Sequence, residues 1–190
     1  MRFILIFLIL ASFLSCKKES NLKTYSKHDS VQSTRIAEQS SAKSNFENIL
    51  AKFPSKALPV ADSTDFDDFQ HLPLINEMIS KELKLNQLFS DASNFRINSN
   101  YNLSPDFKTI SITFNKGEME ISTELLNFNS NGELIDHLEI SYDEIAESAI
   151  RKWSEISKGS IIITHENYFE EPTKIEKTVF KILPTGKFQK

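Results

Sequence analysis

The sequence contains few of the residues on which most recognisable sites depend. It has one cysteine and four glycines in 190 residues. A disulfide within the chain needs two cysteines and is therefore excluded. The glycines stand singly, so none belongs to a glycine-rich phosphate loop or to the G-x-S-x-G turn of serine hydrolases.

Histidines are equally sparse, and they do not form a metal-binding motif. His28, His71, His137 and His165 are scattered, without an H-E-x-x-H motif or a close pair. We therefore predict no metal, no cofactor and no enzymatic activity. The one alternative is that His165 and Glu166 act as a general acid–base pair, although nothing in the sequence shows that these side chains converge.

The longest uncharged apolar run lies at the N-terminus. A basic start at Arg2 precedes an apolar run from Phe3 to Leu14, and the small residue Ser15 follows it. This order is typical of a secretory signal. At about 1.5 Å per residue the run is too short to cross a bilayer comfortably. We expect residues 1–15 to be an export signal; the alternative is a short transmembrane anchor that remains attached.

The only cysteine follows this run directly. Phe13-Leu14-Ser15-Cys16 resembles the lipobox of bacterial lipoproteins, in which a small residue precedes the cysteine that becomes lipid-modified. The resemblance implies that Cys16 is the first mature residue and carries several acyl chains. Several chains hold a protein on a membrane firmly, whereas one chain holds it only reversibly. A catalytic role for Cys16 is disfavoured, because such a cysteine needs a folded pocket.

The resemblance also implies a location. Bacterial lipoproteins reside in the cell envelope, and the chain is similar to small lipoproteins of Bacteroidota in its Phe53-Pro54, Leu58-Pro59 and Gly186-Lys187-Phe188 motifs. Lys17-Lys18-Glu19 supplies no acidic run directly after Cys16. We therefore expect anchoring to the outer membrane on its periplasmic face.

Residues 16–45 are expected to form a flexible tether. They contain seven serines and only scattered apolar residues, without a helical or strand period. The alternative is a helix around Val31 to Lys43, since Arg35 to Glu38 favours helix. The tether has six basic and three acidic residues, and Arg2 adds one positive charge. The whole-chain charge of −4 therefore leaves −8 for residues 46–190.

The net negative charge of residues 46–190 indicates which classes of binding partner to expect. A domain with a charge of −8 is not expected to bind nucleic acid, which selects basic surfaces. Basic proteins or cations are more suitable partners. The simpler interpretation of the charge is solubility.

Residues 46–190 are predicted to form a single α+β domain, with short N-terminal helices and then an antiparallel meander of about six strands. Apolar residues predict a helix from Phe46 to Phe53, ending before Pro54, and a second from Pro73 to Leu83. Period-two alternation and turn residues predict the strands at 95–103, 107–114, 119–125, 134–141, 160–169 and 174–183, with a short last strand at Phe188.

One further helix is expected within the meander. Ser141-Tyr142-Asp143-Glu144 fits a capping box, and apolar residues at helical spacing follow it to about Lys152. In the alternative interpretation, Arg151 to Ser157 is a strand that pairs across Lys158-Gly159.

Two polar segments contain oxygen ligands that could bind a cation. The spacing from Asn127 to Leu138 resembles a calcium loop, but its first position is neutral and its twelfth is apolar, so a hairpin turn at Asn131-Gly132 is favoured. Four aspartates could bind a hard cation from a loop, although a solvated loop or a helix start is favoured. They are Asp62, Asp65, Asp67 and Asp68.

The aromatic residues of the segment Tyr168 to Pro172 suggest a partner-binding rim, with packing in the core or at a sheet edge as the favoured alternative.

Together these features predict a membrane-anchored envelope lipoprotein with a small binding or structural domain and a possible protein partner. The alternative function is an immunity-type lipoprotein that neutralises a basic toxin.

Overall fold

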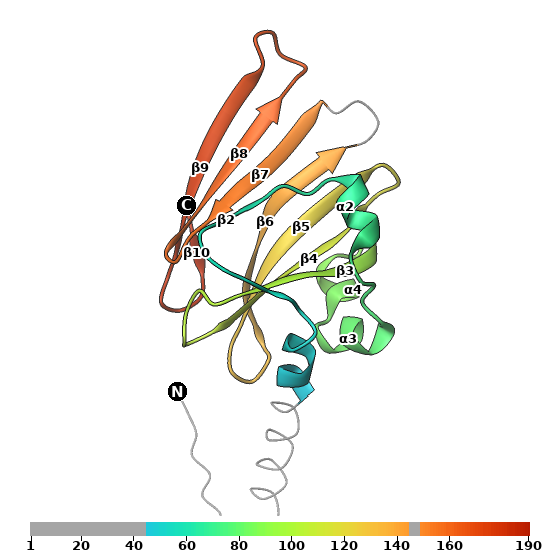
Figure 1. Cartoon of the computed structure of the whole chain (residues 1–190), viewed down its shortest axis with the longest axis vertical. Helices are drawn as coiled ribbons and strands as arrows, with labels where there is room; N and C mark the ends of the chain where they lie inside the picture. Colours follow the sequence, from blue (N-terminus) through green and yellow to red (C-terminus); the bar gives the residue numbers. More distant parts are fainter. Residues whose placement is uncertain (1–44, 145–148) are drawn as a thin grey trace, which may run out of the picture.

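The computed structural model describes residues 45–144 and 149–190, which form a mostly β structure (Figure 1). Strands account for 50% of the structure and helices for 15%. The predicted α+β class with a meander of about six strands was therefore wrong. The six expected strands form, but further strands join them in one ten-stranded sheet.

The strands follow the order β1-β3-β4-β5-β6-β7-β8-β9-β10 across the sheet, and β2 pairs separately with β7. Their bounds are β1 Ser55–Lys56, β2 Val60–Asp62, β3 Ala92–Tyr101, β4 Lys108–Lys116, β5 Glu120–Phe128, β6 Leu134–Glu144, β7 Ile150–Ile156, β8 Ser160–Asn167, β9 Lys174–Ile182 and β10 Phe188–Gln189. The described helices are short: 45–50, α2 Phe66–His71, α3 Glu77–Glu82 and α4 Leu85–Leu88.

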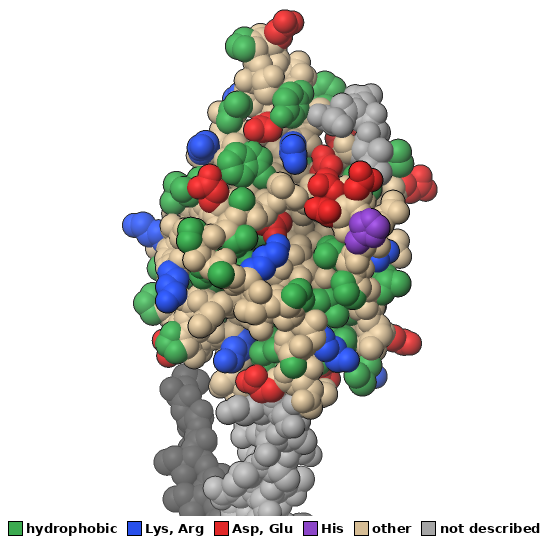
Figure 2. All heavy atoms as spheres, in the orientation of Figure 1, with side chains coloured by type: hydrophobic (Ala, Val, Ile, Leu, Met, Phe, Trp, Pro, Cys, Tyr) green, Lys and Arg blue, Asp and Glu red, His purple; other side chains and the backbone are tan. Residues whose placement is uncertain are grey.

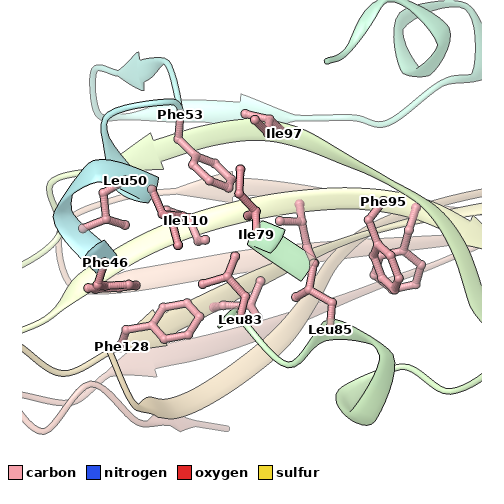
Figure 3. Packing of buried hydrophobic residues seen from close by; sticks show 14 of the residues in the cluster. Phe46, Leu50, Phe53, Ile79, Leu83, Leu85, Phe95, Ile97, Ile110 and Phe128 are labelled. Atoms are coloured by element: carbon pink, nitrogen blue, oxygen red, sulfur yellow. The ribbon is translucent and has the colours of Figure 1, made fainter. Parts of the chain in front are cut away.

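One face of the early strands is covered by the helices. Successive side chains of a strand point to opposite faces, so Ile110 and Ile112 of β4 share the apolar face. Phe46 of helix 45–50 and Leu83, just after α3, point toward this face and toward Phe128 of β5 (Figure 3). The rings of Phe46 and Phe128 lie 5.2 Å apart. This cluster is the larger of the two apolar cores, with fifteen buried residues against six in the second.

A second apolar cluster lies on the other face of the sheet. Leu125 belongs to this cluster, whereas its neighbour Leu126 belongs to the first, as alternation requires. Ile156 of β7 and Ile161 of β8 pack against it. The later strands therefore curve across the early ones. The chain end returns to β6, where the Phe188 N–H donates to Asp136 Oδ2 at 2.9 Å.

The junction of β6 and β7 corrects the prediction of an inserted helix from Tyr142 to Lys152. Residues 142–144 belong to β6 and 150–152 to β7; Ala149 lies just before β7, and 145–148 lie outside the described residues. The strand alternative was right, since β7 pairs with β8 over its whole length. Ser141 does not cap a helix, because its hydroxyl bonds buried groups instead. Tertiary packing has overridden a local helical signal.

The predicted first helix is confirmed, because residues 45–50 are helical and the helix ends before Pro54. The second helix starts later than expected. Pro73 lies before it, and Asn76 is the cap, whose Oδ1 accepts a hydrogen bond from the Ile79 N–H at 3.0 Å. The signal at 1–15, Cys16, His28 and nearly all of the tether lie outside the described residues. No helix in the described ranges has the length and hydropathy to span a membrane.

Gly117 and Gly132 allow the cost of backbone strain to be measured separately from the cost of a packing clash. Gly132 and Gly117 both have positive φ, at +80° and +95°. A Cβ on Gly132 would lie 2.9 Å from Phe46 Cγ, whereas a Cβ on Gly117 would meet nothing within 4 Å.

Gly117→Ala should lower the free energy of unfolding by about 1 kcal/mol. Gly132→Ala should cost about 1–3 kcal/mol more, because Phe46 must shift. Urea unfolding of both variants measures the difference, and equal losses would contradict the packing of helix 45–50 on this turn.

Candidate functional site

The strongest polar feature of the domain is a buried carboxylate, Asp62, at the end of β2. It is only 4% exposed. Its Oδ1 accepts a hydrogen bond from Ser141 Oγ at 2.9 Å, and its Oδ2 lies 3.4 Å from the Tyr101 hydroxyl. Lys56 Nζ lies 3.8 Å from Oδ2. The carboxylate thus has a partner for each oxygen, which a buried charge requires.

Hydroxyl groups continue this network across the sheet. Thr64 Oγ1 contacts Ser141 Oγ at 2.5 Å and also bonds Thr123. Thr123 Oγ1 in turn lies 2.8 Å from Thr113 Oγ1 of β4. Burial and the nearby Asp62 charge raise the pKa of Tyr101, so the phenol remains a protonated donor. Asp62 at the end of β2 and Thr64 after it are therefore bonded to β3, β5 and β6 by side chains, and Thr123 extends the network to β4.

A polar cleft of about 370 Å³ opens beside this network. Its charged and amide lining consists of Lys56, Asp62, Asp65, Asp68, His71 and Asn98. Acidic side chains gather close to a histidine on the same face in the space-filling view (Figure 2). The cleft is suited to a small polar group, and its carboxylates favour a positively charged one.

The four aspartates have different roles in the structure. Asp65 caps α2, since its Oδ1 accepts a hydrogen bond from the Asp68 N–H at 2.8 Å. Asp67 and Asp68 lie in the first turn of this helix, where carboxylates are favourable. The helix-start interpretation was right for these three, and Asp62 is the buried exception. Across the part of the chain that the structure describes, no group of three or more potential ligands could hold a metal ion.

The predicted calcium-like segment is a hairpin turn with a buried anchor. Asn127 is fully buried, accepts a hydrogen bond from Thr109 Oγ1 at 2.7 Å and donates one to the Gly186 carbonyl at 2.7 Å. Asn129 Oδ1 accepts from the N–H groups of Asn131 and Glu133. These bonds use the oxygens that a cation would need, so the hairpin interpretation was right.

The suggested acid–base pair does not form. His165 and Glu166 are neighbours on β8 and point to opposite faces. His165 lines a shallow groove of about 400 Å³ with Leu138 and Phe180. Glu166 lies on the outer face, where it accepts hydrogen bonds from Trp153 Nε1 at 3.3 Å and from the Tyr168 hydroxyl at 2.5 Å.

A histidine–carboxylate pair that the sequence did not indicate joins β5 and β6. His137 Nδ1 lies 3.0 Å from Glu124 Oε2, and the His137 ring packs edge-on against Phe89 at 5.4 Å. His137 therefore lies at the border of the first apolar cluster, to which Phe89 belongs. The bond with Glu124 raises the pKa of His137, and burial raises the pKa of Glu124. Only the cross-strand register could have revealed this pair.

The aromatic segment after β8 is exposed. Tyr168 is 50% exposed and Phe169 is 65% exposed, so the packing alternative was wrong for these side chains. Ile175 and Val179 of β9 are also exposed, at 58% and 53%. The β8–β9 hairpin thus presents apolar groups to solvent, as a partner-binding surface does.

Asp62 provides a test of the buried network. Asp62→Ala should lower the free energy of unfolding by about 3 kcal/mol, because the Ser141 and Tyr101 hydroxyls lose a buried acceptor. Asp67→Ala, in the same segment but exposed, should cost less than about 1 kcal/mol. Urea unfolding at neutral pH compares the two variants. Equally small decreases in the free energy of unfolding of the two variants would contradict a stabilising role for the buried network.

The His137–Glu124 pair provides a test by pH. Because its folded pKa is raised, protonated His137 stabilises the fold fully below its unfolded pKa of about 6.5, and the contribution is lost as the pH rises through the folded value. The stability difference between wild type and His137→Gln should therefore shrink as the pH rises above about 6.5 and through the raised folded pKa. It should stay below about 1 kcal/mol, because the side chain is 41% exposed. Glu124→Gln should remove the same pH dependence; a difference that does not vary with pH would exclude the pair.

The described residues thus form a buried network, a polar cleft beside it and an exposed apolar hairpin. Comparison of the chain with family models, curated proteins and solved structures found no match. No known activity is therefore transferred to the chain, and its function is inferred from these features.

Proposed function

We propose that the chain is a lipid-anchored protein of the cell envelope whose folded domain binds a protein partner. The observation that carries the anchor is the position of Cys16. It follows an apolar run and the small residue Ser15, and 28 residues separate it from the first described helix, 45–50. A cysteine on a chain segment ahead of the domain suits lipid attachment better than catalysis.

The arrangement of the domain supports a binding role. The chain enters the domain at helix 45–50, and the β8–β9 hairpin tip lies at the opposite end of the long axis (Figure 1). Anchored through Cys16, the domain would present the exposed Tyr168 and Phe169 at its far end from the entry point. Aromatic side chains are enriched in protein interfaces, because they bury a large area with few rotatable bonds.

The sheet behind this hairpin is a stable support for such a surface. Strands β7, β8 and β9 pair over most of their length, β2 pairs with the end of β7, and Asp62 of β2 is bonded to Ser141 of β6. A preorganised surface loses little entropy on binding. The absence of catalytic activity and the periplasmic location stay predictions.

Replacing the cysteine tests the anchor. Cys16→Ser should move the protein from the membrane fraction to the soluble fraction and abolish incorporation of labelled fatty acid, because the thiol is the attachment point. The matched control is Cys16→Ser combined with Ser20→Cys, which retains one thiol four residues away. This control should also be released and unlabelled. A Cys16→Ser protein that remains membrane-bound would refute lipid anchoring and favour the transmembrane alternative.

A further inference from the structure

The outer side of β9 is an open sheet edge within the described residues. β8 pairs along one side of β9 from Lys174 to Lys181. On the other side, β10 pairs only with Lys181 and Ile182. Seven residues, Lys174 to Phe180, therefore have no described strand beside them. Such an edge presents backbone donors and acceptors to a further strand.

The hydrogen-bond register shows which backbone groups face outward. The Ile182 N–H donates to the Gly159 carbonyl at 3.0 Å, so Ile182 points toward the β8 side. Backbone direction alternates along a strand. The N–H and C=O groups of Ile175, Lys177 and Val179 therefore point away from β8.

The side chains of the same three residues share the outer face of the sheet. Ile175 and Val179 are the exposed apolar pair, and Lys177 lies between them. The Lys177 ammonium lies 5.9 Å from the centre of the Trp153 ring. Among the described residues, the neighbouring Lys174 is paired with Glu176 at 3.0 Å, whereas no carboxylate lies within ion-pair distance of Lys177. The edge thus combines an apolar–cationic–apolar order with outward backbone groups.

We propose that β9 binds an extended segment of a partner protein as an added strand, in which an acidic residue stands between two apolar residues. Backbone bonds to Ile175, Lys177 and Val179 would supply affinity, as in other strand additions, and alternate side chains would supply specificity. The carboxylate would lie opposite Lys177, and the apolar residues opposite Ile175 and Val179. This proposal rests on the proposed binding role but does not depend on the lipid anchor.

A second copy of this chain fits the edge less well. The two-fold antiparallel register that uses all seven residues places Lys177 opposite Lys177 of the copy. Like charges directly opposite each other destabilise a strand pair. Lysine on an edge strand also opposes self-association generally. The charge therefore favours an acidic partner segment over both a second copy and a basic partner.

A pair of peptides tests the charge rule. The probes are fluorescein-labelled Thr-Val-Thr-Glu-Thr-Val-Thr and the same peptide with Lys in place of Glu, titrated with the full chain in detergent. Fluorescence anisotropy should show about fivefold tighter binding of the Glu peptide. In Lys177→Glu the preference should reverse. Equal binding of both peptides by both proteins, or no binding, would overturn the proposal.

A proline variant tests the backbone bonds. Val179→Pro removes an outward N–H but no bond to β8, so it should reduce binding of the Glu peptide at least about tenfold. Its melting temperature should stay within about 5 °C of wild type. Val179→Thr keeps the N–H and should bind within about threefold of wild type. Unchanged binding by Val179→Pro would overturn strand addition.

The oligomeric state tests whether a second copy of the chain occupies the β9 edge. Sedimentation of the full chain should show no dimer that Val179→Pro dissociates. Such a dimer would assign the edge to a second copy and overturn the proposal. Because all these measurements are made in detergent, their failure would leave the Cys16 test of membrane anchoring unaffected.

Discussion

The buried carboxylate of Asp62 is the interaction on which the arrangement of the sheet depends. Burial of an ionised group is costly unless hydrogen bonds and an opposite charge compensate it. Ser141, Tyr101 and Lys56 supply that compensation from β6, β3 and β1. Because these partners come from distant parts of the chain, satisfying one carboxylate places β2 against the middle of the sheet.

This placement determines the shape of the later strands. Along the side of β7 that faces β6, β2 pairs with Ser154–Ile156, and β6 pairs with β7 only at Tyr142 and Lys152. The later strands are thereby free to curve, and the second apolar cluster fills the space between them and the early strands. β9 is left near the far end of the sheet with an open edge. The edge of β9 is open because β10 pairs only with Lys181 and Ile182.

Several elements could be predicted because their signal is local. Alternation over residues 107–114 and 174–183 identified β4 and β9, and glycine with polar neighbours identified the turns. The helix expected at Tyr142 to Lys152 failed for a physical reason. Ser141 can cap a helix or bond a buried carboxylate, and its actual partner, Asp62, lies 79 residues away. Likewise, no local feature distinguishes buried Asp62 from exposed Asp67.

The sequence by itself determined the period-two segments, the turns between them and the order of residues around Cys16 that predicts a lipid anchor, because each depends on neighbours within a few positions. Tertiary structure alone decided which apolar residues became core. Leu126 lies in an alternating strand segment and is buried. Ile175 and Val179 lie in a segment with the same strand pattern but remain exposed. The difference arises because nothing among the described residues covers the outer face of β9, and coverage depends on contacts between residues far apart in the chain.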